Sequence, residues 1–515
     1  MRIRRWAPLL VTGALATLAP TLMPARASAA DPLHRFHHQR PEWHRCGATM
    51  PAAYRCATLK VPLDYRRPTG KTIDLAVSRM KTSTPGKRHG VMLFNPGGPG
   101  MPGALMPMVM ADTMPETVRE RYDLIGFDPR GVGRSTPLSC GLTTAEQSIK
   151  RPYHPGTFQK DVAWARSIAG KCRAHHGDDL RHFTTRNTAR DMDVLRAVLG
   201  EKKISYLGTS YGTYLGAVYT QLFPERTDRF VLDSAVDPAR IWRGMFQSWA
   251  KGAEEAFPRW ARWTARHDAT YHLGTTPAAV RKTFWDLVAR ADRKPVPHNG
   301  DTLNGDGIRA TMQPLFVTPE FAAETVADLH KAAAGSGKPA KDTAPAEGAE
   351  PADGAGDSGP GDDAPADNSP AAFWSLACGD TAWPRDPAQY RRDAARDKRA
   401  YPLYGDFTSN ITPCAFWAEP AEPATTVNNT TGVLTVQNQW DSQTPLASGL
   451  GMHRALKGSR MLYVAGGEGH GVYKKDPRTC ADRTINAYLT TGQLPPHDLT
   501  CKVSGAPAEG TTPAH

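Results

Sequence analysis

The sequence has 515 residues, of which 40% are hydrophobic and 22% are charged, and its formal net charge is +12. This length exceeds what one simple hydrophobic core supports, so it predicts a large domain with an insertion, or two or more domains. The composition excludes a chain that is disordered throughout. Lys and Arg are scattered among acidic residues, which favours a solvated basic surface over nucleic-acid binding.

The first 30 residues have the features of a secretory signal peptide. Arginines at positions 2, 4 and 5 precede an apolar stretch from Trp6 to about Met23, and the small residues of ARASAA offer a cleavage site after Ala30. The apolar stretch is short and interrupted by prolines, which favours a signal peptide over a membrane anchor. We therefore expect a secreted, extracellular protein without stable membrane association after cleavage.

Residues 31–42 are expected to form a flexible leader or pro-segment. Three histidines lie there, His34, His37 and His38, and this cluster is more consistent with a flexible leader than with a metal site.

Eight cysteines follow the signal segment, and an even number in an exported chain implies disulfides. Eight cysteines can pair in many ways. Neighbours in the sequence suggest Cys46–Cys56, Cys140–Cys172, Cys378–Cys414 and Cys480–Cys501. The sequence has no C-x-x-C motif, which argues against a zinc ribbon.

Residues 43–238 predict the first part of an α/β core. Residues 56–80 are typical of two strands around a turn at 67–70. Further predicted elements are a strand with a glycine-rich loop at Gly90–Gly100, a strand with a loop at Tyr122–Ser135, a capped helix at Asn187–Gly200 and a strand at Arg229–Pro238. Strands that alternate with helices indicate a mostly parallel sheet.

The pattern changes after residue 238. Residues 239–430 predict a helical cap insertion, with the Trp-rich FQSWAKGAEEAFPRWARWTARHD as its clearest helix. Within it, residues 332–372 are largely Ala, Gly, Pro, Ser and Asp, so we expect that tract to be disordered. Strand character returns in residues 431–503, which should complete the core, and residues 504–515 should form a flexible tail.

A Gly-Thr-Ser-Tyr-Gly pattern at residues 208–212 lies between a predicted strand and a predicted helix. A serine hydroxyl is a weak nucleophile that needs a base, and G-x-S-x-G presents its Oγ on a strained strand-to-helix turn. The glycines are needed there because side chains would contact the neighbouring strand and helix. Ser210 is therefore a candidate nucleophile, and an ordinary glycine-flanked turn is the alternative.

The partners of such a serine follow in the order acid, then histidine. Asp441 follows a strand at 433–438, and His470 follows a strand at 461–465. Both lie past the carboxyl ends of strands, the edge where sites gather in open α/β sheets. In these roles His470 accepts the proton of Ser210, and Asp441 orients the imidazole. Glu468 is the less favoured acid because it is too close to His470 in sequence.

An oxyanion hole needs two backbone N–H groups aimed at one oxygen. Tyr211, directly after the candidate nucleophile, would supply one. The loop Asn95–Gly100 would supply the other through Gly97 or Gly98. This loop matches neither GxxxxGK[ST] nor GxGxxG, which argues against phosphate binding.

Several segments together resemble the secreted bacterial tripeptidyl aminopeptidases, a family in the prolyl-iminopeptidase-like branch of the α/β-hydrolases. The segments are VPLDYRRPTG, NPGGPG, FDPRGVGRSTPLSC, NTARDMDVLRAVLGEKKISYLGTSYGTYLGAVY, QWDSQTP with GHG, and the cysteine-containing LACGDTAWP and TPCAFW. The resemblance covers nearly all of residues 43–501 apart from 332–372. In one departure, residues 101–103 are Met-Pro-Gly where related loops commonly continue with Gly-Ser-Gly, which affects the shape of the pocket mouth.

The resemblance implies an α/β-hydrolase fold with a large helical lid and a serine exopeptidase that removes short peptides, often tripeptides, from free N-termini. It carries the catalytic triad onto Ser210, Asp441 and His470 and the oxyanion loop onto Asn95–Gly100. It implies no metal or organic cofactor, and peptide or protein N-termini as substrates.

An exopeptidase must also hold the α-ammonium group of its substrate, and a carboxylate at a fixed distance from Ser210 would set how many residues are removed. Asp380 and Asp233 are candidates, with capping or turn roles as the alternative for both. The helical insertion would act as a lid that admits only chain termini.

Three other functions are compatible with parts of the sequence. A secreted esterase or lipase could use the same triad, although the cap is Trp-rich and heavily charged, unlike an apolar lipase lid. A prolyl-type aminopeptidase is the second alternative. A non-catalytic binding protein on a hydrolase scaffold is the third, and the intact Ser, Asp and His argue against it. The sequence favours no particular oligomeric state.

Overall fold

The computed structural model describes residues 31–316, 318–335, 364–473, 476 and 478–503. Within this part of the chain ten strands form one sheet, in the order β1-β2-β3-β5-β4-β6-β7-β10-β11-β12. The strands are β1 His44–Arg45, β2 Arg55–Pro62, β3 Thr72–Met80, β4 Gly90–Asn95, β5 Tyr122–Phe127, β6 Ile204–Thr209, β7 Thr227–Asp233, β10 Leu434–Trp440, β11 Arg460–Glu468 and β12 Leu499–Lys502. The expected signal segment 1–30 and tail 504–515 lie outside the described residues.

The sheet is antiparallel at one side and parallel through the rest. β1, β2, β3 and β5 pair antiparallel, and the predicted hairpin is the β2–β3 pair. From β5 through β4, β6, β7, β10 and β11 to β12 every pairing is parallel. The carboxyl ends of these parallel strands therefore meet at one edge. The predicted α/β-hydrolase fold is confirmed.

Helices cover both faces of the sheet, which explains why β4 and β5 are buried along their whole length. Met92 and Phe94 of β4 belong to the apolar cluster under α2 Met106–Thr113, α3 Glu116–Arg119 and α16 Cys480–Thr491. Val91 and Leu93 belong to the cluster on the opposite face, under α5 Thr185–Val198, α6 Tyr211–Leu222 and α15 Leu446–Ala455. Because successive side chains of a strand point to opposite faces, β4 contributes to an apolar core on each face of the sheet.

Residues 31–42, expected to be a flexible leader or pro-segment, are not a flexible leader, because they are ordered against the core. They form α1 His34–His37, whose Phe36 side chain is 2% exposed among apolar residues of the α5 face. Gln39 donates a side-chain hydrogen bond to the carbonyl of Lys60 at 2.8 Å. The expectation failed because it considered the polar histidines and not the single aromatic residue that gains from burial.

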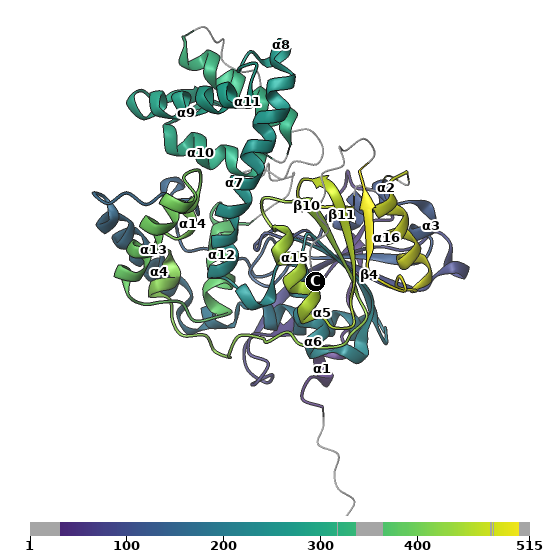
Figure 1. The fold of residues 1–515 in the computed structure, drawn as a ribbon. Helices are drawn as coiled ribbons and strands as arrows, with labels where there is room; N and C mark the ends of the chain where they lie inside the picture. The colour runs from purple at the N-terminus through teal and green to yellow at the C-terminus, as the bar shows by residue number, and fades with distance from the viewer. Residues whose placement is uncertain (1–30, 317, 336–363, 474–475, 477, 504–515) are drawn as a thin grey trace, which may run out of the picture.

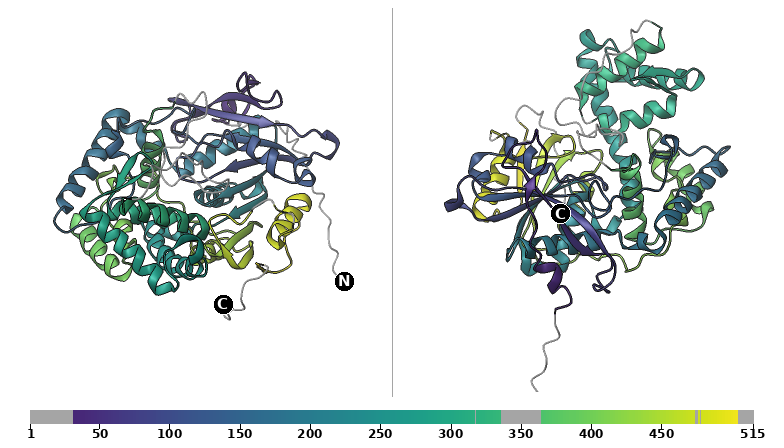
Figure 2. Two further views of the ribbon diagram at one scale, coloured as in Figure 1. Left: turned by 90° about the horizontal axis from the view of Figure 1, so that it is seen from above. Right: turned by 180° about the vertical axis from the view of Figure 1, so that it is seen from behind.

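The cap is inserted between β7 and β10, which are neighbours in the sheet. Its long helix α7, Arg243–Arg266, leads away from the sheet toward a helical lobe (Figures 1 and 2). That lobe has its own apolar cluster, which includes Phe257, Trp260, Phe284 and Phe316. The elements of the cap after α7 are α8 Asp268–Tyr271, α9 Pro277–Arg293, β8 Val296–His298, β9 Asp301–Leu303, α10 Gly305–Leu315, α11 Pro319–Ala333, α12 Asn368–Gly379, α13 Pro387–Ala400 and α14 Gly405–Thr408.

A helix that precedes the Ser210 turn in the sequence also belongs to the cap. α4, Phe158–His176, lies beside α13 and α14 rather than on the sheet (Figure 1). The Trp164 ring packs edge-on against Trp374 of α12 at 6.4 Å, and the Arg166 guanidinium lies 4.3 Å from the ring centre of Phe416. The cap is therefore built from two segments of the chain, which the sequence did not indicate.

Short 3₁₀ turns lie between elements of the core and of the cap: η1 Pro85–Lys87, η2 Thr144–Glu146, η3 Gly177–His182, η4 Pro224–Arg226, η5 Pro238–Arg240 and η6 Pro413–Phe416.

The expected disordered tract at 332–372 is ordered at its C-terminal end. α12 begins at Asn368, whose side-chain amide donates to the carbonyls of Gly131 and Leu138 and accepts from the N–H of Gly133. Asp367 accepts the N–H groups of Cys140 and Leu142. Composition did not reveal these long-range hydrogen bonds, and residues 336–363 lie outside the described part.

Four disulfides are present, and they join Cys46–Cys56, Cys140–Cys172, Cys378–Cys414 and Cys480–Cys501. These are the pairs that neighbouring positions in the sequence suggest. Cys140–Cys172 links the loop after β5 to α4, and Cys378–Cys414 closes the second half of the cap.

A buried ion pair links the loop after β5 to α5. The Arg130 guanidinium and the Asp191 carboxylate are both 0% exposed and make two hydrogen bonds, of 2.6 and 2.7 Å. Arg130 also donates to the carbonyls of Pro62, Leu63 and His182. One side chain thereby satisfies backbone groups from the end of β2 and from the segment before α5.

Replacing Asp191 with Ala should strongly destabilise the fold because it leaves a buried guanidinium without its carboxylate. We expect the free energy of unfolding to fall by about 3–5 kcal/mol, measured by urea denaturation. The control is Asp286→Ala, which removes the partner of an exposed Lys282 and should change the same quantity by less than about 1 kcal/mol. Equal effects of the two substitutions would contradict the expectation.

Candidate active site

Ser210 lies on a sharp turn between β6 and α6. Its backbone has φ 57° and ψ −125°, a sparsely populated conformation that costs an L-residue about 1–3 kcal/mol. Two backbone hydrogen bonds hold it, because the Ser210 N–H donates to the carbonyl of Asp233 at 3.0 Å and the Ser210 carbonyl accepts the N–H of Thr213 at 2.9 Å. The setting is the strand–turn–helix that the sequence predicts for a nucleophile.

The two glycines of the pattern are there because backbone approaches closely on both sides. A Cβ on Gly208 would lie 2.5 Å from the carbonyl oxygen of Gly212, and a Cβ on Gly212 would lie 2.6 Å from the carbonyl oxygen of Asn95. Larger residues would force α6 away from β6 and β4. The glycines therefore allow the strained turn to pack against the glycine-rich loop.

His470 and Asp441 meet in the loops after β11 and β10. The Nδ1 atom of His470 lies 2.9 Å from Oδ2 and 3.1 Å from Oδ1 of Asp441, and the two side chains are 6% and 0% exposed. This contact fixes the ring so that Nε2 points away from the acid. Glu468 instead pairs with Arg259.

The Asp441 carboxylate is held in its ionised form by donors. Oδ1 accepts the N–H groups of Gln443 and Thr444, and Oδ2 accepts the hydroxyl of Thr444 at 2.8 Å. Burial raises the pKa of Asp441, but the charge and hydrogen bond of His470 and the donors of Thr444 outweigh it, so the pKa lies below its ordinary value. Thr444 was not singled out from the sequence, although it lies in the same QWDSQTP segment.

The glycine-rich loop lies directly against Ser210. A Cβ on Gly97 would lie 2.9 Å from the Cβ of Ser210 and 3.6 Å from its Oγ. The N–H of Gly97 donates to the side-chain oxygen of Asn95, whereas no hydrogen bond within the described residues uses the N–H of Gly98. Tyr211 is the first residue of α6, and the first N–H groups of a helix have no intrahelical acceptor.

Asp128 supports the far end of this loop. Its Oδ1 accepts the N–H groups of Gly103 and Ala104 at 3.0 and 2.9 Å. Asp128 directly follows β5, so it anchors the loop after β4 to the neighbouring strand. The sequence does not indicate this contact, apart from placing Asp128 at a strand end.

The two acids considered for the substrate ammonium are both engaged inside the protein. Asp380, at the end of α12, accepts the N–H and the hydroxyl of Thr185 at 2.7 and 2.6 Å and the indole N–H of Trp242 at 3.0 Å. Asp233 accepts the N–H groups of Val472 and Tyr473. The reason in both cases is burial, because a buried carboxylate must be matched by donors. Both carboxylates thus bind donors of the protein itself.

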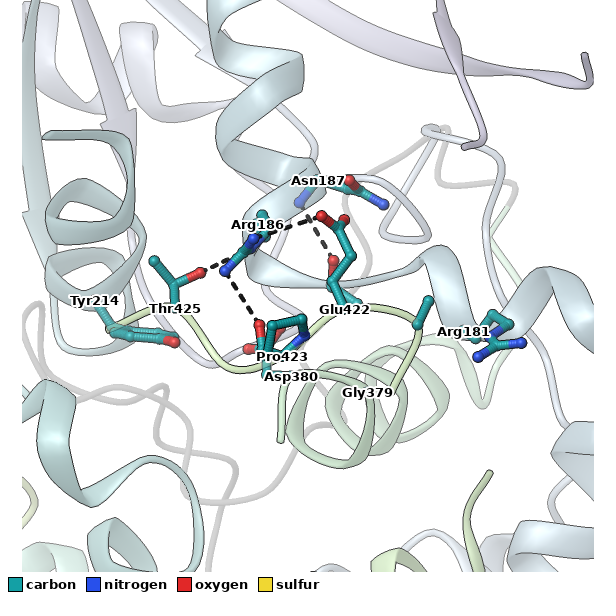
Figure 3. A pocket seen from close by; sticks show the side chains of 11 residues that line it. Arg181, Arg186, Asn187, Tyr214, Gly379, Asp380, Glu422, Pro423 and Thr425 are labelled. Atoms are coloured by element: carbon teal, nitrogen blue, oxygen red, sulfur yellow. Dashed lines mark hydrogen bonds and ion pairs between the residues drawn. The ribbon is translucent and has the colours of Figure 1, made fainter. Parts of the chain in front are cut away.

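Asp380 and Tyr214 line a small pocket at the junction of the core and the cap (Figure 3). Arg186 crosses it and donates to the hydroxyl of Thr425 and the carbonyl of Pro423. Glu422 accepts two hydrogen bonds from Arg190. Arg186 and Glu422 are thus hydrogen-bonded to protein groups. We therefore interpret the pocket as part of the contact between core and cap.

Through α7 the cap contacts the loops that carry Asp441 and His470. A Cβ on Gly252 would lie 2.5 Å from the carbonyl oxygen of Ser442, next to Asp441. Further along α7, the Arg259 guanidinium lies 4.2 Å from the ring centre of Trp440 and forms an ion pair with Glu468. Trp440 precedes Asp441 and Glu468 comes two residues before His470, so one cap side chain contacts the base of both loops.

The described residues contain no cluster of three or more His, Cys, Asp or Glu side chains arranged to hold a metal ion. In the same part of the chain, no helix combines the length and the apolar composition that a membrane crossing needs.

Comparison with known proteins places the chain in a family. Residues 401–501 match the family described as TAP-like protein, and residues 90–286 match the family described as alpha/beta hydrolase fold. The tripeptidyl aminopeptidase of Streptomyces lividans is 35% identical over 486 residues, which are 90% of this chain and 87% of that protein. The chain belongs to the tripeptidyl aminopeptidase family of α/β-hydrolases.

Other members of this family carry different names. The serine protease Hip1 of Mycobacterium tuberculosis is 30% identical, with 96% of this chain and 97% of that protein covered. A protein of the same organism named carboxylesterase B is 32% identical, with 87% and 86% covered. Among solved structures, the proline iminopeptidase of Mycobacterium smegmatis aligns with 13% identity and a TM-score of 0.35 over 84% of this chain and 97% of that one. The family membership makes this chain a serine hydrolase of a peptidase family.

Replacing Gly97 with Ala should displace Ser210, the candidate nucleophile, because the added methyl group would lie 2.9 Å from the Cβ of Ser210 at a residue with φ 116°. We expect the rate of labelling by a fluorophosphonate to fall by about 100-fold or more, as a small misplacement of a reacting atom does. Gly86→Ala is the control, since nothing lies within 4 Å of its Cβ position. Labelling of Gly97→Ala at the wild-type rate would contradict this geometry.

Asp380 should make stability depend on pH in an unusual direction. Burial raises its pKa from 3.8 to about 6, so between these values the folded state binds more protons than the unfolded state. The free energy of unfolding of the wild type, relative to that of Asp380→Asn, should fall by about 3 kcal/mol as pH rises from about 4 to about 7. Urea denaturation of both proteins across this range measures the difference, and a difference that is constant with pH would overturn the expectation.

Proposed function

We propose that the protein is a secreted serine exopeptidase that releases short peptides, most readily tripeptides, from free N-termini. The observation that carries the proposal is the His470–Asp441 pair at the same sheet edge as Ser210 on its strained turn. That arrangement supports nucleophilic acyl transfer, and family membership supports peptides as the acyl donors.

In the proposed reaction the Ser210 Oγ attacks the carbonyl carbon of the scissile peptide bond, and His470 Nε2 takes the hydroxyl proton. Asp441 stabilises the imidazolium that forms and keeps the ring oriented. His470 then gives this proton to the departing amine, which leaves an ester between Ser210 and the released peptide. Water, deprotonated by His470, hydrolyses the ester and restores the serine hydroxyl.

The oxyanion of each tetrahedral intermediate would be bound by the N–H groups of Tyr211 and Gly98. Gly98 is preferred to Gly97 because the Gly97 N–H is already donated to Asn95 inside the loop. Backbone donors held in place by Asp128 and by α6 need no reorganisation as the negative charge develops.

Preference for N-termini rests on the cap and on the family. α7 lies against the Asp441 loop and leads into the helical lobe, so the cap covers one side of the site (Figures 1 and 2). Such a cover favours chain ends over the middle of a folded chain. The name of the Streptomyces lividans relative supports tripeptides as the released unit.

Secretion is supported by the four disulfides, because such bonds persist in oxidising compartments and are rare in the cytosol. The signal-like composition of residues 1–30 agrees with this.

Ester hydrolysis is the second candidate, and one observation favours it. The relative named carboxylesterase B is 32% identical to this chain, between the 35% and the 30% of the two named peptidases. The same triad cleaves an acyl ester by the same route, so only the substrate separates the two functions.

The deciding experiment compares three substrates: a tripeptide anilide with a free amine, its N-acetyl derivative, and a short-chain acyl ester. We expect efficient cleavage of the free tripeptide anilide and a value of kcat/KM about 100-fold lower for the acetylated one, because acetylation removes the charge that the site must recognise. Free peptides of graded length, analysed by the mass of the released fragment, give the number of residues removed.

Ser210→Ala is the control and should abolish cleavage of all three substrates. Equal cleavage of the free and acetylated anilides would contradict an exopeptidase. A marked preference for the acyl ester would favour the esterase.

A further inference from the structure

Two neighbouring strands end in the same unusual way. Thr209 at the end of β6 and Asp233 at the end of β7 are register partners in the parallel sheet. The next residue on each strand is a serine with φ 57°, Ser210 on β6 and Ser234 on β7. Ser210 is the proposed nucleophile, so the matching conformation of Ser234 calls for its own explanation.

The side chains of Asp233 and Ser234 hold the loop that carries His470. The Ser234 Oγ accepts the N–H of Gly471 at 2.7 Å. The Asp233 carboxylate accepts the N–H of Val472, at 2.8 and 3.0 Å from its two oxygens, and the N–H of Tyr473 at 2.9 Å. Three consecutive backbone donors directly after the histidine are therefore bound by two consecutive residues of β7.

The backbone of the same two residues binds the other parts of the site. The Asp233 carbonyl accepts the N–H of Ser210, and the Ser234 N–H donates to the carbonyl of Val436 in β10, the strand that leads to Asp441. The next N–H, that of Ala235, donates to the Gln437 side chain, whose amide donates to the carbonyl of Thr444 in the Asp441 loop. The end of β7 thus contacts the segments that carry all three triad residues.

These residues are fully enclosed. Asp233 is 2% exposed and Ser234 is 0% exposed, so water does not compete for their hydrogen bonds. From the other side, the Asn438 amide donates to the carbonyls of Gly469 and Gly471. The His470 loop therefore donates its N–H groups to Asp233 and Ser234 on one side, and its carbonyls accept from Asn438 on the other.

We infer that Asp233 and Ser234 are positioning residues that set the placement of His470 relative to Ser210. The inference rests on the proposed serine-hydrolase function. Ser234 adopts positive φ so that its Oγ reaches the Gly471 N–H while its own N–H still pairs with Val436. Glycine would adopt this backbone without strain but has no oxygen to offer. The Ser234 hydroxyl is therefore needed to bind the His470 loop and not to form the turn itself.

The test uses Ser234→Gly, Ser234→Ala and Asp233→Asn in the full-length protein. We expect Ser234→Gly to unfold within a few degrees of the wild type while kcat for the free tripeptide anilide falls about 10-fold at unchanged KM. Ser234→Ala should lower kcat similarly. Asp233→Asn should lower it more, because a carboxamide replaces one of the acceptor oxygens with a donor.

A structural contribution alone would not produce this pattern. Ser205→Ala is the matched control, since Ser205 is 1% exposed, donates one side-chain hydrogen bond to Asp228, and lies at the opposite end of β6. It should leave kcat unchanged. Wild-type kcat in Ser234→Gly, or an equal loss in Ser205→Ala, would overturn the inference.

A second readout does not depend on the substrate. The downfield proton resonance of the His470 Nδ1–H, hydrogen-bonded to Asp441, should be sharp in the wild type and in Ser205→Ala. It should broaden or shift in Ser234→Gly and Asp233→Asn. If the wild type cleaves none of the substrates, the proposed function fails while this resonance still tests the placement of the loop, and an unchanged resonance in both variants would refute it.

Discussion

Ser210 has a backbone conformation that an L-residue disfavours, and the rest of the site depends on how that conformation is maintained. The strain is offset by contacts on every side of the turn: Gly208 and Gly212 allow β6, α6 and β4 to approach, and the Ser210 N–H is bound by the end of β7. These contacts require the parallel register of neighbouring strands. The sheet therefore keeps a high-energy turn in place, with the half-buried Ser210 side chain at its carboxyl edge.

The helical cap is more than a cover over this edge. Through Arg259 and Gly252, α7 contacts the residues immediately around Asp441 and just before His470. Asp380 connects α12 and Trp242 of the cap to Thr185 of α5, and the Thr185 hydroxyl lies 2.9 Å from the Tyr211 hydroxyl. The cap therefore contacts both sides of the site: α7 meets the loops that carry Asp441 and His470, and Asp380 after α12 meets Thr185, which contacts Tyr211 at the start of α6.

Much of the architecture could be predicted from the sequence because the signals are local. The strand–turn–helix around Ser210, the hairpin at 56–80 and the order Ser, Asp, His each depend on short segments, and His470 pairs with Asp441 as the order suggests. The functions of Asp233 and Phe36 could not be predicted, because their partners are distant in sequence. The sequence does not distinguish an aspartate that binds a substrate amine from one that accepts the N–H of Val472, 239 residues away.

The start of α12 illustrates the same limit. Composition predicted a disordered tract through residue 372, whereas Asp367 and Asn368 are held by backbone groups of the segment 131–142. α4 carries no motif that marks it as part of the cap. Its place follows from contacts with Trp374 and Phe416, residues more than 200 positions later.

That place of α4 has a consequence for engineering the molecule. Because one cap helix precedes Ser210 and the others follow β7, and because Cys140–Cys172 fastens α4 to the loop after β5, the cap is not a single cassette in the gene. Exchanging residues 239–430 for those of a relative would leave α4 facing a foreign surface. A chimera that keeps the contacts of α4 with Trp374 and Phe416 has to replace both segments together, although Ser210 lies between them in the sequence.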